Sequence, residues 1–340
     1  MKLMPRLRQR SRMSSDESNS RICHPGRIEG SFRKLKRCFA ALSKTSVRRN
    51  WSERLTFLAF VAPNFLLFIG FTYWPILYSA YLSLTNWNFL TPAPTFAGLE
   101  NYFLLAKDEK FWAVLSNSLT YALSVVLIAQ GLAFLLALLL NRKLPGQPFF
   151  RTLAFAPHIT MTAAAALVWV LLLDPQLGPL SHIYNALGVQ GPRWLASSAL
   201  ALWAVIIVGI WKEIGFSSVF FLAGLQGINH DYYDAARVDG ASTWAILRQI
   251  TLPLMTPVIF FLMVSGFIQA MKVFDTVAIM TAGGPVYPDS ATYVYHLYKL
   301  AFRDFRAGYA SAFAVIFFVV IMAMTLAQLK LSDRWVHYGE

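Results

Sequence analysis

Charged side chains are scarce in this sequence. Of its 340 residues, 14% are Asp, Glu, Lys or Arg and 56% are hydrophobic. Soluble domains carry about 25% charged residues, which keep the folded surface in water. The shortage therefore excludes an ordinary soluble domain and indicates a chain that lies mostly in a membrane.

Cysteine is almost absent as well. The two cysteines, Cys23 and Cys38, both lie near the N-terminus, and neither has a His or acidic neighbour at a spacing typical of metal ligands. The sequence predicts neither a disulfide framework nor a metal site.

The dipeptide Gly-Lys does not occur, so the chain cannot contain the phosphate-binding loop G-x-x-x-x-G-K-[ST]. We expect no bound cofactor and no catalytic residue on this chain. Any work driven by ATP would have to be done by a partner that binds the nucleotide.

Positive charge is concentrated near the N-terminus. The net charge is +13, and 15 of the 30 Lys and Arg lie in residues 1–54, together with four acidic residues. This segment is poor in apolar residues and lacks helical periodicity, so we interpret it as a mostly disordered cytoplasmic tail. Aromatic residues interleave with its charges only at Phe32 and Phe39, which argues against nucleic-acid binding.

Six apolar stretches are long enough to cross a bilayer, which takes about 20 residues. They lie at 55–74, 114–140, 149–173, 199–223, 254–279 and 309–329. With the N-terminus inside, 22 Lys and Arg fall on the cytoplasmic side and six outside, as the positive-inside rule requires. The sequence predicts an all-α integral membrane protein with six transmembrane helices and both ends in the cytoplasm.

A polar segment, residues 229–253, separates the fourth span from the fifth and is expected in the cytoplasm. Asn229 or Asp231 can cap a short helix, and Gly240 supplies the left-handed position that ends it. Ser242 can cap a second helix. A helix pair joined to two spans is suited to transmitting force rather than to catalysis.

Part of this segment, DAARVDGASTWAILRQITLP (234–253), resembles the cytoplasmic signature loop of binding-protein-dependent ABC importer permeases. That signature reads Glu-Ala-Ala, then Gly a few residues on, then Ile-x-Leu-Pro. Asp234 stands where the family usually has Glu. Three further matches are FAGLENY (96–102), TAGGP (281–285) and RWVHYGE (334–340). The chain is most similar to sugar and glycerol-3-phosphate permeases of the maltose-transporter type.

The resemblance implies a six-helix permease domain over 55–340, which pairs with a second, homologous permease. Two cytoplasmic ATPase subunits, binding ATP and Mg²⁺, would receive the signature loops, and an extracytoplasmic solute-binding protein would deliver the solute. The residues implied in ATPase coupling are Asp234, Ala235, Ala236, Asp239, Gly240, Ile250 and Pro253. The expected location is the cell (inner) membrane of a bacterium or archaeon.

Polar residues inside the spans are the candidates for the solute pathway. Lys212 and Glu213 lie near the middle of the fourth span, where charge is costly and usually functional. Pairing with the second permease explains them equally well. Lys272 and Asp275, three residues apart, favour a local ion pair. The remaining candidates, each also suited to plain helix packing, are Trp169, Ser217 and Gln269.

Two other function classes explain the sequence less well. A secondary transporter would carry an internal repeat and would leave the segment 229–253 unexplained. A membrane transferase acting on lipid-linked sugars would need paired acidic residues at one face, and the loop acids are scattered. For an importer, we expect a sugar or oligosaccharide as the solute. Glycerol-3-phosphate or a related organophosphate is the alternative, because Lys212 could pair with a phosphate.

Overall fold

The computed structural model describes residues 51–142 and 145–335. Most of the expected tail, both cysteines and most of the C-terminal RWVHYGE match lie outside this range. The chain divides into two compact units, residues 1–70 and 71–340, and each is described by itself.

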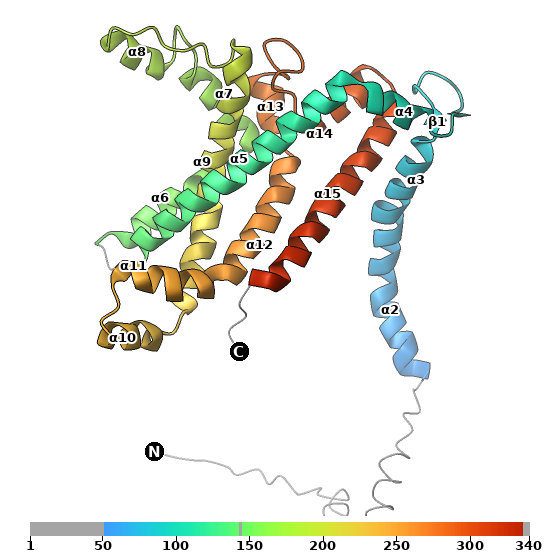
Figure 1. The fold of residues 1–340 in the computed structure, drawn as a ribbon. Helices are drawn as coiled ribbons and strands as arrows, with labels where there is room; N and C mark the ends of the chain where they lie inside the picture. The colour runs from blue at the N-terminus through green and yellow to red at the C-terminus, as the bar shows by residue number, and fades with distance from the viewer. Residues whose placement is uncertain (1–50, 143–144, 336–340) are drawn as a thin grey trace, which may run out of the picture. The chain divides into compact units, whose positions relative to one another are not determined.

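The described residues are mostly helical (Figure 1). Five helical runs are long and apolar enough to cross a membrane, and the count becomes six if one bent pair forms a single span. This confirms the all-α membrane fold. In the unit 71–340 the long helices are α5 (Glu109–Leu140), α9 (Ser198–Gly227), α12 (Leu252–Met271) and α15 (Ala307–Trp335), and the bent pair is α6 (Gln147–Ile159) and α7 (Thr162–Leu172).

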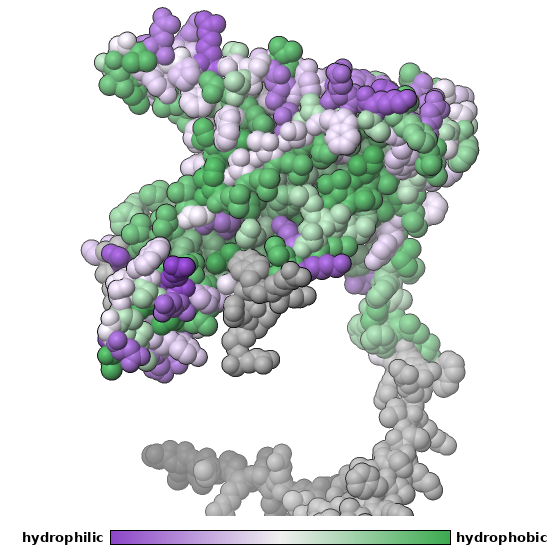
Figure 2. All heavy atoms as spheres, in the orientation of Figure 1, coloured by the Kyte–Doolittle hydropathy of each residue, from purple (hydrophilic) through white to green (hydrophobic). Residues whose placement is uncertain are grey.

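Short elements lie between these helices. At one end of the unit 71–340, which we call the α4 end, are α4 (Glu100–Lys107), α8 (Pro179–Ala186), α13 (Asp275–Met280) and the hairpin of β1 (Thr85–Asn86) and β2 (Thr95–Phe96). At the opposite end, the α10 end, are α10 (His230–Val238) and α11 (Thr243–Ile246). Figure 2 shows apolar side chains over the middle of the helices and polar ones gathered towards these two ends.

The first span extends further than the sequence predicts. α2 (Trp51–Phe68), the π-helical turn η1 (Ile69–Tyr73) and α3 (Trp74–Leu82) follow one another directly, and the apolar run covers Leu55–Leu82 instead of 55–74. Pro75, in the first turn of α3, has no N–H to donate. The wide π-helical turn before it accommodates this loss, so the helix continues.

The prediction of one helix over 149–173 is wrong. α6 and α7 meet at an angle of 97°. Pro157 lies in the last turn of α6, and Thr160 then adopts an extended conformation with ψ 138°. Because proline removes one N–H from the helical ladder, the span is weakest at this point.

The predicted boundaries of the fifth span are also wrong. A single helical run covers Thr243–Met271, so the second helix of the polar segment and the span are continuous. The π-helical turn η2 (Leu247–Thr251) directly precedes Pro253 in α12 and absorbs its missing N–H. The run ends at Met271 rather than 279, because Lys272 caps it and α13 begins separately.

α5 is the central helix of the unit 71–340 and packs along α9 and α12. Four alanines on α5 are completely buried and recur every four to seven residues: Ala122, Ala129, Ala133 and Ala137. Small residues at this spacing let neighbouring helices approach closely, which is how helices gain packing energy in a membrane. At the α4 end the packing is formed by aromatic rings instead of alanines: Phe111, Tyr293 and Phe313 pack against one another.

The connection between α12 and α15 is fastened to α5 at the α4 end. The amide Nδ2 of Asn117 donates to three carbonyl groups, those of Pro288, Asp289 and Ala291, at 2.8–3.2 Å. This connection also contains α14 (Tyr293–Tyr298) and the π-helical turn η3 (Lys299–Arg303). A loop of more than thirty residues is therefore held against the helices.

Candidate functional site

The polar segment between α9 and α12 folds as the sequence predicts up to Ser242. Asn229 caps α10, accepting a hydrogen bond from the N–H of Asp231 at 3.0 Å. After α10, Gly240 adopts φ 75°, a left-handed conformation that glycine reaches without strain. The side chain of Ser242 accepts from the N–H of Ala245 at 3.2 Å and caps α11.

Contacts inside the segment make it compact. The N–H of Ala241 reaches back to the carbonyl of Ala236 at 2.9 Å, which the left-handed Gly240 permits. The hydroxyl groups of Tyr233 and Thr251 are 3.4 Å apart and join α10 to η2. A movement of α10 would therefore be passed to α12 and α9, to which it is joined at both ends.

The predicted coupling residues divide into two groups. Asp234, Ala235, Asp239 and Gly240 are exposed, so they are available to a partner. Ala236 is buried, and Ile250 and Pro253 are half-buried in the helical run that leads into α12. The second group shapes the segment instead of presenting a surface.

Asp234 has a partner that the sequence analysis did not assign. Its Oδ1 lies 3.1 Å from Nη1 of Arg237, one turn further along α10. Both side chains are more than two-thirds exposed, so the pair adds at most about 1 kcal/mol to stability. The pair orients the carboxylate on the outer face of α10.

Large apolar side chains stand exposed on the same segment. They are Tyr232, Val238 and Trp244, with 57%, 87% and 68% of their surface accessible. Sequence analysis did not select them as contact residues. The sequence did contain a sign of this surface. Tyr233 and Ala236 already provide the side chains with which α10 packs inward, so its other apolar residues are left exposed. Large apolar groups exposed on α10 and α11 are typical of a surface that contacts another protein.

Inside the membrane region, Ser217 does not face an open pathway. It is completely buried on α9 and donates a hydrogen bond to Oε1 of Glu213 at 3.0 Å. It also accepts one from Nε2 of Gln130 on α5 at 3.0 Å. Glu213 thus has a hydrogen-bond partner within the helix bundle. The sequence contains only a weak sign of Gln130, a lone amide in an apolar span, and it was not among the predicted residues.

Lys212 points to a different neighbour. Its Nζ donates to the carbonyl oxygen of Thr160, at the break between α6 and α7, at 2.7 Å. Thr160 also lines a hollow of about 440 Å³ between α7 and α9. Its other lining residues are Ala164, Ala165, Val168, Trp169, Leu172 and Trp211. The rings of Trp169 and Trp211 meet edge to face with centroids 5.8 Å apart.

Of the remaining candidates, Lys272 and Asp275 do not form the expected ion pair. In the described part of the chain the one salt bridge joins Arg237 and Asp234. Lys272 ends α12 and Asp275 begins α13, so the two do not lie on one helix. Asp275 interacts electrostatically with Lys212 instead. Gln269 is exposed near the end of α12.

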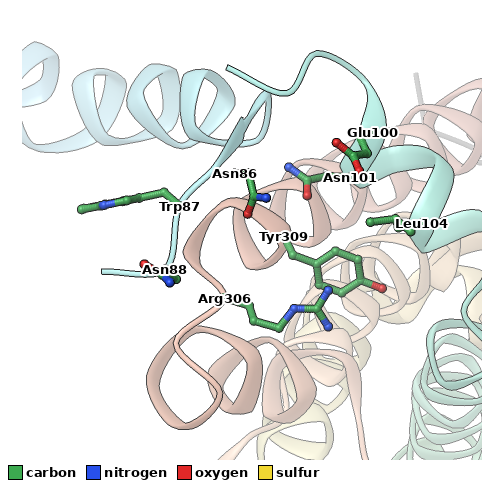
Figure 3. Close-up of a pocket in the computed structure, with 8 residues that line it drawn as sticks. All are labelled: Asn86, Trp87, Asn88, Glu100, Asn101, Leu104, Arg306 and Tyr309. Atoms are coloured by element: carbon green, nitrogen blue, oxygen red, sulfur yellow. The ribbon is translucent and has the colours of Figure 1, made fainter. Parts of the chain in front are cut away.

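A small polar pocket opens at the α4 end (Figure 3). Its volume is about 110 Å³, and its lining residues are Asn86, Trp87, Asn88, Glu100, Asn101, Leu104, Arg306 and Tyr309. The guanidinium group of Arg306 lies 4.2 Å from the centre of the Tyr309 ring. The pocket combines hydrogen-bonding groups of both kinds with two aromatic rings, and sequence analysis did not identify it.

Comparison with known proteins places these features in context. Residues 131–338 match the family model described as "Binding-protein-dependent transport system inner membrane component". The chain is 35% identical over 291 residues to the probable ABC transporter permease protein YesP of Bacillus subtilis, covering 84% of this chain and 93% of that protein. It is 32% identical over 282 residues to the sn-glycerol-3-phosphate transport system permease protein UgpA of Agrobacterium fabrum, covering 82% and 95%.

A solved structure shows the same architecture. It is a chain of a bacterial ABC transporter involved in the import of the acidic polysaccharide alginate. The TM-score is 0.75 at 25% identity, and the match covers 85% of this chain and 99% of that chain.

Proposed function

Because the chain belongs to the family of binding-protein-dependent transport system inner membrane components, we propose that it forms one half of a solute pathway and couples it to a separate ATPase. The other half is a second permease of the same family. A solute-binding protein delivers the solute on the outer side, and two ATPase subunits carry the ATP and Mg²⁺. The chain itself is a transport subunit and not an enzyme.

The observation that carries this proposal is the surface of α10. An exposed carboxylate, that of Asp234, lies on a short helix with exposed apolar groups, and short connections join this helix to α9 and to the helical run that leads into α12. We infer that this surface lies in the cytoplasm and fits a cleft on the ATPase. Closure of the ATPases then moves α10, and the movement passes through α9 and α12 to the pathway.

The solute is proposed to be a sugar or oligosaccharide. Likeness to a transporter of an acidic polysaccharide supports this, as does the hollow with its two tryptophan rings, because aromatic faces suit the apolar faces of sugar rings. An organophosphate such as glycerol-3-phosphate is the second candidate, supported by the likeness to UgpA.

At the α4 end, we propose that the polar pocket contacts the solute-binding protein. Arg306 and Glu100 are both exposed at the pocket and form no salt bridge within the described residues. Either can pair with an opposite charge on that protein. A rim contact of this kind would affect the rate of docking and its salt dependence.

The coupling role is tested by Gly240→Val in the assembled transporter, with both permeases, the ATPases and the binding protein present. A β-branched residue at φ 75° is strained by about 1–3 kcal/mol, so the turn after α10 changes shape. We expect assembled transporter but at least a tenfold loss of solute uptake.

Gly227→Val is the matched control. Gly227 lies at the other side of the same segment, has no positive φ, and a Cβ added there meets nothing within 4 Å. Uptake should stay within about twofold of the wild-type rate. Wild-type uptake by Gly240→Val would show that the segment does not transmit the movement.

A further inference from the structure

The break in the third span leaves one backbone carbonyl, that of Thr160, without a backbone N–H donor in the described part of the chain. The N–H of Thr160 donates to the carbonyl of Ala156 at 3.3 Å, and its hydroxyl group donates to the carbonyl of Pro157 at 2.7 Å. The carbonyl of Thr160 itself accepts no backbone N–H from the residues that the structure describes. An unpaired carbonyl at membrane depth is costly, because no water is present there to donate a hydrogen bond.

Lys212 supplies the missing donor from a helix 52 residues further along the chain. Its Nζ lies 2.7 Å from this carbonyl oxygen. The C-terminal end of α6 also carries the negative end of the helix dipole, which favours an ammonium group there. This hydrogen bond therefore satisfies the carbonyl and gives the ammonium group a partner, in addition to its electrostatic interaction with Asp275.

Close packing holds Lys212 in this place. Three residues further along α9, a Cβ added at Gly215 would lie 2.5 Å from the carbonyl oxygen of Ala154 on α6. The backbones of α6 and α9 are therefore in contact within one turn of Lys212, and α9 cannot slide along α6. On the other face of α9, Glu213 is held by Ser217.

The same break creates the hollow. Thr160 is part of its lining, α7 supplies Ala164 and Val168, and Trp211 is the neighbour of Lys212 on α9. If α6 and α7 formed one straight helix instead of meeting at 97°, α7 would lie in a different orientation relative to α9. The hollow thus depends on the bend, and Lys212 contacts the backbone at that bend.

We propose that Lys212 is a positioning residue. It donates a hydrogen bond that caps the broken third span and keeps α7 in the orientation that forms the hollow with Trp169 and Trp211. It acts through its donor group and does not recognise the charge of the solute. This inference rests on the proposed function only in treating the hollow as part of the solute pathway.

A pair of variants separates the donor from the charge. Lys212→Gln keeps an N–H donor, on a side chain one atom shorter, and removes the charge. Lys212→Met has the same length as Gln and removes both the donor and the charge. Each is made in the complete transporter, in a background with Cys23 and Cys38 replaced by Ser and a single cysteine at Ala164, an exposed position in the hollow.

The measurement is the rate at which a maleimide alkylates the cysteine at 164 without any solute. We expect Lys212→Gln to stay within about twofold of the parent and Lys212→Met to differ by at least fivefold. If the transporter with Lys212→Met does not assemble while the one with Lys212→Gln does, that result also supports the role of the donor group. Uptake should fall in Lys212→Met and be largely kept in Lys212→Gln.

Other results overturn the proposal. Equal changes in both variants, or failure of both to assemble, would mean that the charge matters, through an anionic solute or the second permease. Unchanged alkylation in both would mean that the cap is not needed. Alkylation is measured without solute. The proposal about Lys212 can therefore be contradicted while Gly240→Val still abolishes uptake, and the proposed function would survive that result.

Discussion

Neighbouring side chains on α9 serve opposite sides of the bundle. Lys212 and Glu213 point about 100° apart because successive helical residues do. Lys212 reaches α6, and Glu213 is linked through Ser217 to Gln130 on α5. Two charges that are costly in a membrane are thereby each given hydrogen-bond partners.

Another buried polar residue, His296 on α14, lies outside the spans. It is 3% exposed, its Nδ1 contacts the hydroxyl group of Tyr287, and no partner is found for its Nε2 among the described residues. Burial lowers the pKa of His296 to about 4, and nearby charges act in both directions: Asp108 and Asp304 raise it, and Lys299 and Lys110 lower it. The ring is therefore neutral at pH 7.

This burial predicts a loss of stability in acid. Between pH 6.5 and pH 4 the unfolded chain takes up a proton at His296 that the folded chain does not, so the free energy of unfolding falls as the pH falls. By pH 5 the loss should be about 2 kcal/mol. Thermal unfolding of the protein in nanodiscs at pH 7.5 and pH 5 measures it.

His296→Gln should make the unfolding temperature less dependent on pH, whatever its effect at pH 7.5. The same substitution at His230, an exposed position on α10, should leave the pH dependence as in the wild type. An equal pH dependence in the wild type and His296→Gln would contradict this account.

At the scale of elements, prolines decide where the sequence-based boundaries fail. Pro75 and Pro253 follow π-helical turns and do not end their helices, whereas Pro157 precedes a bend of 97°. The difference lies in the turn before each proline: a π-helical turn precedes Pro75 and Pro253, whereas Pro157 stands in an α-helix that ends at Ile159. Sequence alone reveals neither these turns nor the contact of Lys212 at the break.

The helical caps were easier to predict. Asn229, Gly240 and Ser242 act within a few residues of their own positions, so local chemistry determines them. The hollow, the buried network of Gln130 and the pocket at the α4 end each join residues far apart in sequence. They could not be derived from spacing.

The docking of α15 gives a prediction at this scale. A Cβ added at Gly308 would lie 2.0 Å from the carbonyl oxygen of Thr85, and the N–H of Gly308 donates to the carbonyl of Trp87 at 2.9 Å. Both contacts involve backbone, which cannot move aside easily. Gly308→Ala should therefore destabilise the fold by about 3 kcal/mol or more.

The unfolding temperature in nanodiscs and the yield of monodisperse protein measure this effect. Gly227→Ala adds the same methyl group where nothing lies within 4 Å, and it should be nearly neutral. An unchanged unfolding temperature for Gly308→Ala would mean that α15 and the hairpin are not in such close contact.

For the whole molecule, the charge distribution predicts the orientation in the membrane. From the 22-to-6 bias of Lys and Arg we predict that the α10 end lies inside the cell and the α4 end outside. Single cysteines at Pro145 and Ser242 should be protected from an impermeant maleimide added to intact cells, with Cys23 and Cys38 replaced by Ser. Cysteines at Thr95 and Val286 should react, since both positions are exposed at the α4 end.

Permeabilised cells provide the control, in which all four positions should be labelled. Labelling of position 242 in intact cells would reverse the orientation and remove α10 from the reach of a cytoplasmic ATPase.

The hydrogen bonds of Asn117 also have a consequence for biosynthesis. The carbonyl groups that its side chain binds belong to residues made 171 to 174 positions later. At about 5–20 residues per second, the ribosome needs roughly 9 to 35 seconds to supply them. For most of that interval α5 is complete but carries an amide without its final acceptors. A nascent chain stalled before residue 288 would therefore hold a polar group in a newly inserted helix, which makes it a natural target for the cell's membrane-protein quality control.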